Sequence, residues 1–315
     1  MKSKIFLLTL VVFLLAGCAE DFLDTAPENT ISNQQLSESP SSLQAIVNGI
    51  YANLRTFGIG GATFHIDYGH VAMRTGLDMR SNDIAQSVFH WYGFFANYDG
   101  RVQTSSRTRV YWNTYYSQIA EANSFINAID ETITDPGPRA ILGQGLALRA
   151  FCMFQLALTY GPAYIGNESA LGVPMPNGQD FEGKPRAPLS QVYALIASDL
   201  EKAVDLLKAF SRTTKQELDQ SVAQGLLAEV YLEMGNWAGA AEMAAQARAN
   251  YPLMSSNQWL GGFSNIENPE WMWGADIDNE SSTVFASFFS HFANTSGGYA
   301  GILGYIRTLT LACTG

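Results

Sequence analysis

The 315-residue sequence is poor in the residues that disulfide-stapled domains, zinc sites and nucleic-acid-binding surfaces need. It has three cysteines, Cys18, Cys152 and Cys313, with no pair at metal-ligand spacing. Such a set excludes a disulfide framework and a zinc site of the usual kind. Lysine and arginine number 18 against 29 acids, so the formal net charge is -11. An acidic surface repels polyanions, which argues against nucleic acid as a partner and against phosphate-rich or acidic ligands.

The sequence also lacks the short motifs that mark common catalytic sites. It contains no Gly-x-Ser-x-Gly elbow, no His-Glu-x-x-His, no phosphate-binding glycine loop and no Gly-x-Gly-x-x-Gly. His65, Asp67 and His70 are close in sequence, and acids alternate from Asp276 to Glu280, but neither group matches a known metal-site spacing. We therefore expect a protein that is not an enzyme and needs no metal or cofactor.

The N-terminus carries the marks of an export signal. Lys2 and Lys4 precede an apolar run at 5–15, and small residues follow at 16–17. The run is shorter than the about 20 apolar residues that span a bilayer, so it predicts a cleaved leader over residues 1–17. The sequence Leu-Ala-Gly-Cys ending at Cys18 resembles the bacterial lipobox, which implies that Cys18 is acylated. The acidic residues that follow resemble a signal for export to the cell exterior.

Hydrophobic periodicity predicts a mainly helical body after this leader. Residues 18–42 are polar and suit a lipidated tether. Residues 56–107 mix glycines, aromatics and single charges without a period, which predicts long loops and short strands. Elsewhere helical spacing, helix starts and proline or glycine breaks predict helices over 43–54, 110–129, 140–160, 188–210, 222–234 and 237–250.

Two of these helices carry related patterns of small and large residues. Residues 144–151, QGLALRAF, resemble residues 224–231, QGLLAEVY. The second segment is followed by Gly235, Asn236 and Trp237, which resembles a tetratricopeptide repeat (TPR) with its glycine turn. A single helical hairpin cannot bury its apolar face alone, so such hairpins stack. We expect TPR-like repeats, with a generic helical bundle as the alternative.

The composition predicts one large globular body with a less regular end. Hydrophobic residues make up 47% and charged residues 15% of the chain, enough to bury a sizeable core. We expect a helical domain over 43–250 with the loop insertion 56–107. After residue 251 the helical pattern fades, and Trp271 and Trp273 alternate like one face of a strand, which favours the core for both. Residues 251–315 are expected to begin a loop-rich part that is incomplete.

The order of segments resembles the SusD/RagB family of outer-membrane nutrient-binding lipoproteins. The segments that carry the resemblance are CAEDFLDTAPENT, LQAIVNGIYANLR, DMRSND, YYSQIAEANSFINAI, ALRAFCMFQLALTYG, GVPMP, RAPLSQVYALIASDLEKAVDLL, AQGLLAEVYLEMGNWAGAAEMA and NPEWMWGADID. The resemblance implies a TPR-like scaffold that packs against a SusC-like, TonB-dependent β-barrel transporter, with a loop-rich second half that builds the ligand site. Family members are much longer, so the chain looks C-terminally truncated.

The segment HWYGFFANYDG, residues 90–100, is the candidate ligand site. It has five aromatic residues and no helical period. Exposed rings can bind the apolar faces of sugars while neighbouring Asn and Asp side chains hydrogen-bond the hydroxyls. The candidates are Trp91, Tyr92, Asn97, Tyr98 and Asp99. The resemblance places ligand contacts in this region too, while the plain alternative is that the rings pin a long loop to the scaffold.

Together these observations predict a lipoprotein, anchored in the outer membrane and facing outward, that captures oligosaccharides for the transporter. The first alternative is a RagB-like protein that captures peptides. From other classes come a surface glycoside hydrolase, for which two facing carboxylates among 29 acids would suffice, and a TPR scaffold without a small ligand.

Overall fold

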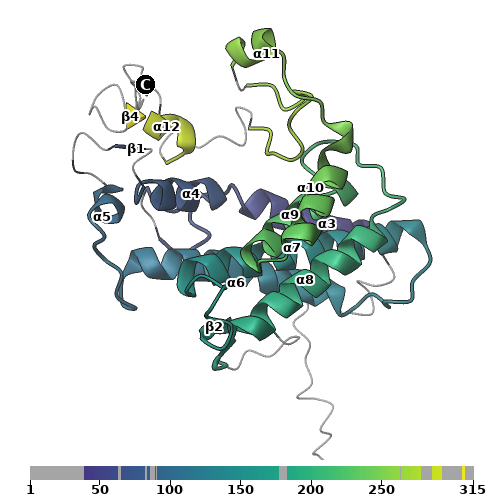
Figure 1. Cartoon of the computed structure of the whole chain (residues 1–315), viewed down its shortest axis with the longest axis horizontal. Coiled ribbons are helices and arrows are strands. Elements are labelled where there is room, and N and C mark those ends of the chain that lie inside the picture. Colours follow the sequence, from purple (N-terminus) through teal and green to yellow (C-terminus); the bar gives the residue numbers. More distant parts are fainter. Residues whose placement is uncertain are drawn as a thin grey trace, which may run out of the picture.

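A ladder of consecutive helices forms the body of this computed structural model (Figure 1). The structure describes residues 39–62, 65–81, 84–85, 89, 91–176, 183–262, 264–277, 286–292 and 307–308. The predicted leader 1–17, the lipidation site Cys18 and most of the tether 18–42 lie outside these residues. The helices are α3 (Pro40–Asn53), α4 (His70–Asp78), α5 (Gly93–Ala96), α6 (Ser106–Ile126), α7 (Pro136–Tyr160), α8 (Leu189–Leu206), α9 (Gln220–Glu233), α10 (Trp237–Ala247) with a 3-10 turn (Arg248–Asn250), α11 (Ser256–Leu260) and α12 (Phe288–Phe292).

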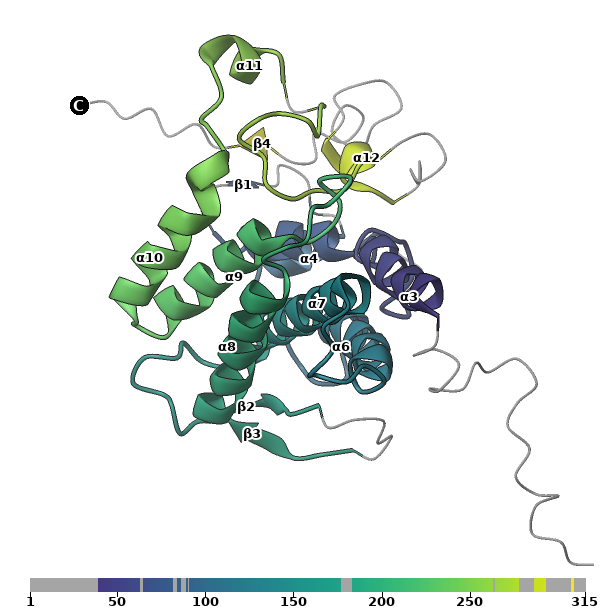
Figure 2. The ribbon, with the colours of Figure 1, turned by 90° about the vertical axis from the view of Figure 1, so that its right-hand side faces the viewer.

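Helices α6 to α10 pack in sequence order, each against the next, and α3 packs on α6 and α7 (Figure 2). This arrangement is the TPR-like, mainly helical fold that the sequence predicts. Two small antiparallel pairs accompany it. Strand β1 (Ile84–Ala85) pairs with β4 (Arg307–Thr308), and β2 (Leu171–Pro174) pairs with β3 (Arg186–Pro188), with an irregular register between its ends.

Helix α7 is the central element of the core. Its N-cap is Asp135, whose side chain accepts a hydrogen bond from the Gly137 N–H at 3.1 Å, and Pro136 occupies the first helical position. Among the described helices, α7 is long and apolar enough to cross a membrane. Since 89% of its most apolar window is buried in the protein, it is a core helix.

Small residues on α7 allow its neighbours to approach closely. A Cβ added at Gly145 would lie 2.3 Å from the ring of Phe125 on α6, and one at Gly143 would lie 2.8 Å from Leu207. Neither position tolerates a larger residue without a shift of the partner. A Cβ added at the corresponding Gly225 on α9 would have Met272, at 3.8 Å, as its nearest described contact. The small residue of the pattern is therefore a tight contact in the first unit and a loose one in the second.

A buried polar cluster joins three of the stacked helices. The Arg149 guanidinium on α7 donates two hydrogen bonds of 2.7 Å to the Asp199 carboxylate on α8 and one of 2.8 Å to Asn123 Oδ1 on α6. The side chains of Arg149 and Asp199 are only 14% and 5% exposed. Because the pair is bidentate and buried, it fixes the register of α6, α7 and α8.

Helix α4 lies within the segment that the sequence predicts as loops, so that part of the prediction is wrong. Its N-cap is Gly69, with a φ of +81°, and no side chain caps the helix. A Cβ at Gly69 would lie 2.2 Å from the Leu54 carbonyl oxygen, and one at Gly76 would lie 2.2 Å from the Tyr111 hydroxyl. The two glycines that allow these contacts are the residues that weaken the helical pattern in the sequence.

Candidate binding site

The aromatic segment 90–100 divides into a buried and an exposed part. Tyr92 is fully buried, and its hydroxyl donates to the Tyr68 hydroxyl at 2.9 Å. The structure places the Tyr92 ring in the core, as the alternative of a pinned loop implies, and not on the exposed surface where a ligand could stack on it. Trp91 is half-buried, and the imidazole of His65 stacks on it at a centroid distance of 3.6 Å. His90 lies outside the described residues.

Asn97, Tyr98 and Asp99 form the exposed tip of the segment. Tyr98 is 52% exposed. Its backbone φ is +59°, a left-handed conformation that costs a non-glycine residue about 1 kcal/mol. The ring is held at two places. Its hydroxyl donates to the Arg80 carbonyl oxygen at 2.5 Å, and the Arg101 guanidinium lies 4.5 Å from its centroid. A fixed, exposed ring beside an amide and a carboxylate suits stacking on a sugar.

A cavity of about 280 Å³ lies beside this tip. Asp99 lines it from the tip, and Arg107 and Thr108 line it from the first turn of α6. The other lining residues are Arg80, Phe95, Gly100, Arg101, Tyr111, Thr159 and Tyr160. Because three arginines line it, we refer to it below as the arginine cavity.

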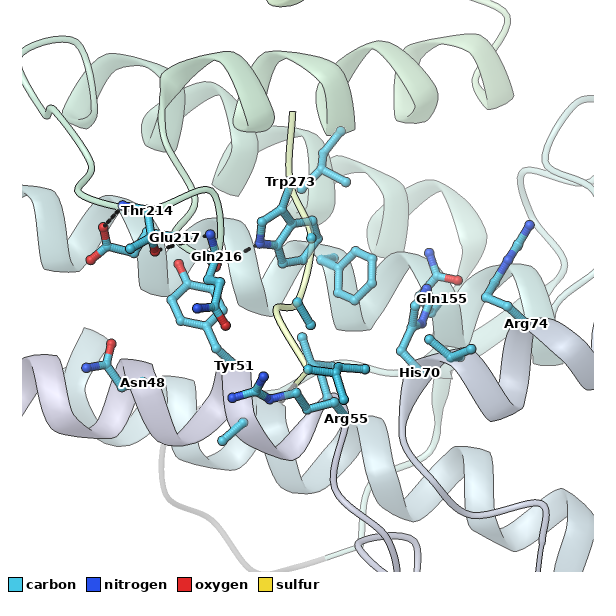
Figure 3. Close-up of a pocket in the computed structure, with 18 of the residues that line it drawn as sticks. Asn48, Tyr51, Arg55, His70, Arg74, Gln155, Thr214, Gln216, Glu217 and Trp273 are labelled. Atoms are coloured by element: carbon cyan, nitrogen blue, oxygen red, sulfur yellow. Dashed lines mark hydrogen bonds between the residues drawn. The ribbon is translucent and has the colours of Figure 1, made fainter. Parts of the chain in front are cut away.

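A larger cavity of about 780 Å³ opens between α3, α4, α7 and the segments 213–217 and 273–277 (Figure 3). Trp273 is its main aromatic side chain. The indole Nε1 donates to the Gln216 carbonyl oxygen at 3.0 Å, and the rings of Phe151 and Tyr51 meet the indole edge to face at 5.5 and 6.4 Å. The indole is thereby fixed at the cavity wall.

Gln155 and His70 line the large cavity on the side away from Tyr51, near Arg74 (Figure 3). Gln155 is 7% exposed, and its side-chain amide makes no hydrogen bond to another residue in the described ranges. The Nδ1 atom of His70 lies 2.9 Å from the Tyr115 hydroxyl. Burial, with a smaller contribution from the charge of Arg74, lowers the pKa of His70 to about 4, so the imidazole is neutral at pH 7. These groups offer uncharged hydrogen-bonding partners to a ligand.

Sequence reasoning missed this second cavity. It predicts Trp271 and Trp273 on one face of a strand, but neither lies in a strand here, and Trp273 faces the cavity with its indole half-buried. Gln155 stands in the apolar run CMFQLAL, and a lone glutamine in such a run is the one signal that was available. Nothing in the sequence shows that these residues, more than a hundred positions apart, line one cavity.

Among the candidate metal ligands, Asp67 has a structural role. The Asp67 carboxylate accepts hydrogen bonds from the Gly60 and Ala62 N–H groups at 3.1 and 3.0 Å, so it holds a turn. Burial raises the pKa of this carboxyl. Within the ranges that the structure describes, no three His, Cys, Asp or Glu side chains are placed to share a metal ion. Asp278 and Glu280 lie outside those ranges.

Comparison with known proteins settles the family. Residues 21–232, more than half of the chain, match the SusD-like family described as "Starch-binding associating with outer membrane". The chain belongs to the SusD-like family. The match includes the exposed tip, the arginine cavity and helices α3 to α8.

The relatives are similar at low sequence identity. A SusD-like protein from Bacteroides ovatus is 25% identical over 291 residues, which cover 86% of this chain and 49% of the relative. The crystal structure of a SusD-like carbohydrate binding protein from Bacteroides vulgatus superposes with a TM-score of 0.68 at 26% identity, covering 78% of this chain and 52% of that one. A laminarin binding SusD-like protein, at 21% identity and a TM-score of 0.51, shares the fold. The chain spans about half the length of these SusD-like proteins.

Proposed function

We propose that this SusD-like chain is part of a non-catalytic lipoprotein that captures oligosaccharides at the cell surface. The observation that carries the proposal is the match of residues 21–232 to a family described as starch-binding and associating with the outer membrane. The similar structure from Bacteroides vulgatus, described as carbohydrate binding, supports the same class of ligand.

The proposed location depends on the N-terminal sequence. Acylation of Cys18 after removal of residues 1–17 would anchor the chain, and the polar tether 18–42 would hold the helical body away from the membrane surface. The stacked helices α6 to α10 would then dock on a SusC-like, TonB-dependent transporter, which receives the oligosaccharide. Helical-repeat surfaces are well suited to such docking because they are extended and rigid.

The proposed grip is the exposed tip of the aromatic segment. The ring of Tyr98 would stack on the apolar face of a sugar, and the side chains of Asn97 and Asp99 would hydrogen-bond its hydroxyls. Trp91 would contribute its outer edge, since His65 covers one face of its indole. The large cavity around Trp273 is the competing location, because an aromatic wall with buried polar groups is also typical of ligand sites.

Isothermal titration calorimetry of the full chain in detergent, against neutral and anionic oligosaccharides and against peptides, tests the proposal. We expect oligosaccharide binding that Tyr98→Ala weakens by about 2- to 10-fold, the effect of one aromatic contact. Trp237→Ala is the matched control, because Trp237 is 60% exposed on α10, away from the tip.

Each other outcome points to a definite alternative. If Trp273→Ala abolishes binding and Tyr98→Ala does not change it, the grip lies in the large cavity. Binding of peptides alone would favour the RagB-like alternative. Recovery of shortened oligosaccharides after prolonged incubation would show a glycoside hydrolase, whereas a binding protein returns them intact.

A further inference from the structure

Three arginines around the arginine cavity each lie on an aromatic ring of the segment 93–98. The guanidinium carbon of Arg107 is 3.6 Å from the centroid of Phe94, that of Arg80 is 5.5 Å from Phe95, and that of Arg101 is 4.5 Å from Tyr98. A guanidinium within about 6 Å of a ring is attracted by the ring's π-system. The aromatic residues of this segment therefore act as supports for positive charge.

These arginines differ from the paired arginines elsewhere in the chain. Arg139, Arg149 and Arg212 form salt bridges with aspartates at 2.7 to 3.0 Å. In contrast, within the described part of the chain, Arg80, Arg101 and Arg107 have no carboxylate within salt-bridge distance, although the chain carries 29 acids. Asp99 is the one acid among the described residues that line the cavity. The described lining of the cavity therefore carries three arginine charges and one carboxylate charge.

The hydrogen-bonding capacity of this cluster is also unfilled. The Nε atoms of Arg80 and Arg107 are buried and have no hydrogen-bond partner among the residues that the structure describes. Unpaired buried donors cost free energy, and so does the mutual repulsion of the cations. Burial lowers the pKa of both side chains, and the charge of Arg101 lowers that of Arg80 further. The positive end of the α6 dipole, at Arg107 and Thr108, adds to the same potential.

We propose that the arginine cavity binds an anionic substituent, a carboxylate or a sulfate ester, carried by the oligosaccharide that the exposed tip holds. This inference rests on the proposed function and names its ligand class. A guanidinium that lies flat on a ring keeps its N–H groups directed outward from its edge, in the fork that matches a carboxylate or sulfate. A bound anion would accept hydrogen bonds from these outward N–H groups and relieve the repulsion between the arginines.

Size and position agree with this ligand. A volume of about 280 Å³ is smaller than most sites for whole ligands and suits a charged substituent with part of its sugar ring. Asp99 and Arg101 lie next to Tyr98, so a sugar on the ring would bring its substituent to the cavity. The net charge of -11 does not forbid this, since charges more than about 8 Å away are largely screened at physiological ionic strength. The expectation that acidic ligands are repelled therefore need not apply at this cavity.

Calorimetry of the full chain in detergent with three oligosaccharides of equal length tests the inference. The probes are maltotetraose, which is neutral, tetragalacturonate, which carries carboxylates, and a sulfated carrageenan tetrasaccharide. We expect one of the anionic probes to bind at least about tenfold more tightly than maltotetraose, with an affinity that falls as salt rises. Comparing the two anionic probes shows whether the substituent is a carboxylate or a sulfate.

Substitutions connect this preference to the cavity. Arg107→Gln should weaken binding of the preferred anionic probe by about 10- to 100-fold, the range for a hydrogen bond to a charged group. Arg101→Gln should act in the same direction, and since Arg101 is exposed, its loss leaves the core intact. The matched control is Arg109→Gln, an exposed arginine on α6 that does not line the cavity. Circular dichroism confirms that each variant is folded.

The possible failures are distinguishable. If maltotetraose binds more tightly than both anionic probes, or if Arg101→Gln and Arg107→Gln leave anionic affinity unchanged, the inference is overturned while the proposed function stands. If no oligosaccharide binds but inorganic sulfate raises the melting temperature in an Arg107-dependent way, the cavity is an anion site and the proposed function is overturned.

Discussion

The buried cluster of Arg149, Asp199 and Asn123 gives the sharpest test of the helical core. Arg149→Met removes the cation and keeps an apolar stem of similar length. The Asp199 carboxylate, 5% exposed, then loses both 2.7 Å hydrogen bonds and its counter-charge. Breaking a buried pair from one side costs about 3–5 kcal/mol, because the remaining charge stays desolvated. With an unfolding entropy of about 2.1 cal/mol/K per residue, that loss lowers the melting temperature by roughly 5–10 °C.

The pH dependence of this variant follows from the same residue. Burial raises the pKa of Asp199, and the hydrogen bonds and charge of Arg149 oppose that rise. Without Arg149 the folded-state pKa rises further above the unfolded value. An acid with a raised folded pKa favours the folded state at low pH, and the penalty grows as pH increases through the unfolded pKa toward the folded one. The variant should therefore lose more stability at pH 7 than at pH 4.

Thermal and urea unfolding, followed by circular dichroism, measure these effects. The double variant Arg149→Met/Asp199→Leu should recover most of the loss, since neither charge remains buried. Lys202→Met is the control, because its salt bridge with Glu131 is 50% and 74% exposed and is worth about 1 kcal/mol or less. A loss for Arg149→Met no larger than that of the control would show that Asp199 is not left buried and unpaired.

Two further predictions concern the helices and the large cavity. Gly145→Ala should destabilise the chain by about 1–3 kcal/mol, because its Cβ would meet the Phe125 ring at 2.3 Å. Gly49→Ala on α3 should stabilise it by about 0.5–1 kcal/mol, because the added Cβ would meet no described atom within 4 Å. Urea unfolding measures both changes, and opposite signs would contradict the packing. His70, with a folded-state pKa of about 4 against about 6.5 unfolded, contributes stability above the unfolded pKa that is lost as pH falls from 6.5 to 4. His70→Gln should flatten that part of the stability curve, and an unchanged curve would show that the imidazole is not buried neutral.

The helical body was predictable because its signals are local. Six stretches with helical period correspond to α3, α6, α7, α8, α9 and α10, and the TPR-like turn at Gly235 has the positive φ of +75° that favours glycine. The start of α7 was predicted four residues too late. The sequence Asp-Pro-Gly-Pro from Asp135 was interpreted as a break, whereas Asp135 is an N-cap and Pro136 is the first helical residue.

The candidate site was predictable only in part, since exposure depends on the whole fold. The aromatic segment was found from its composition, and Tyr98 is exposed as expected. No local pattern distinguishes it from Tyr92, which packs into the core against residues more than 20 positions away. The arginines of the cavity are spread from Arg80 to Arg107, so their convergence on one set of rings is visible only in three dimensions.

A crystal structure of the chain with a bound oligosaccharide would test the central claim most directly. We expect a sugar ring stacked on the exposed face of Tyr98, within hydrogen-bonding distance of Asn97 or Asp99. A ligand seated in the large cavity against Trp273, with Tyr98 left uncovered, would contradict it.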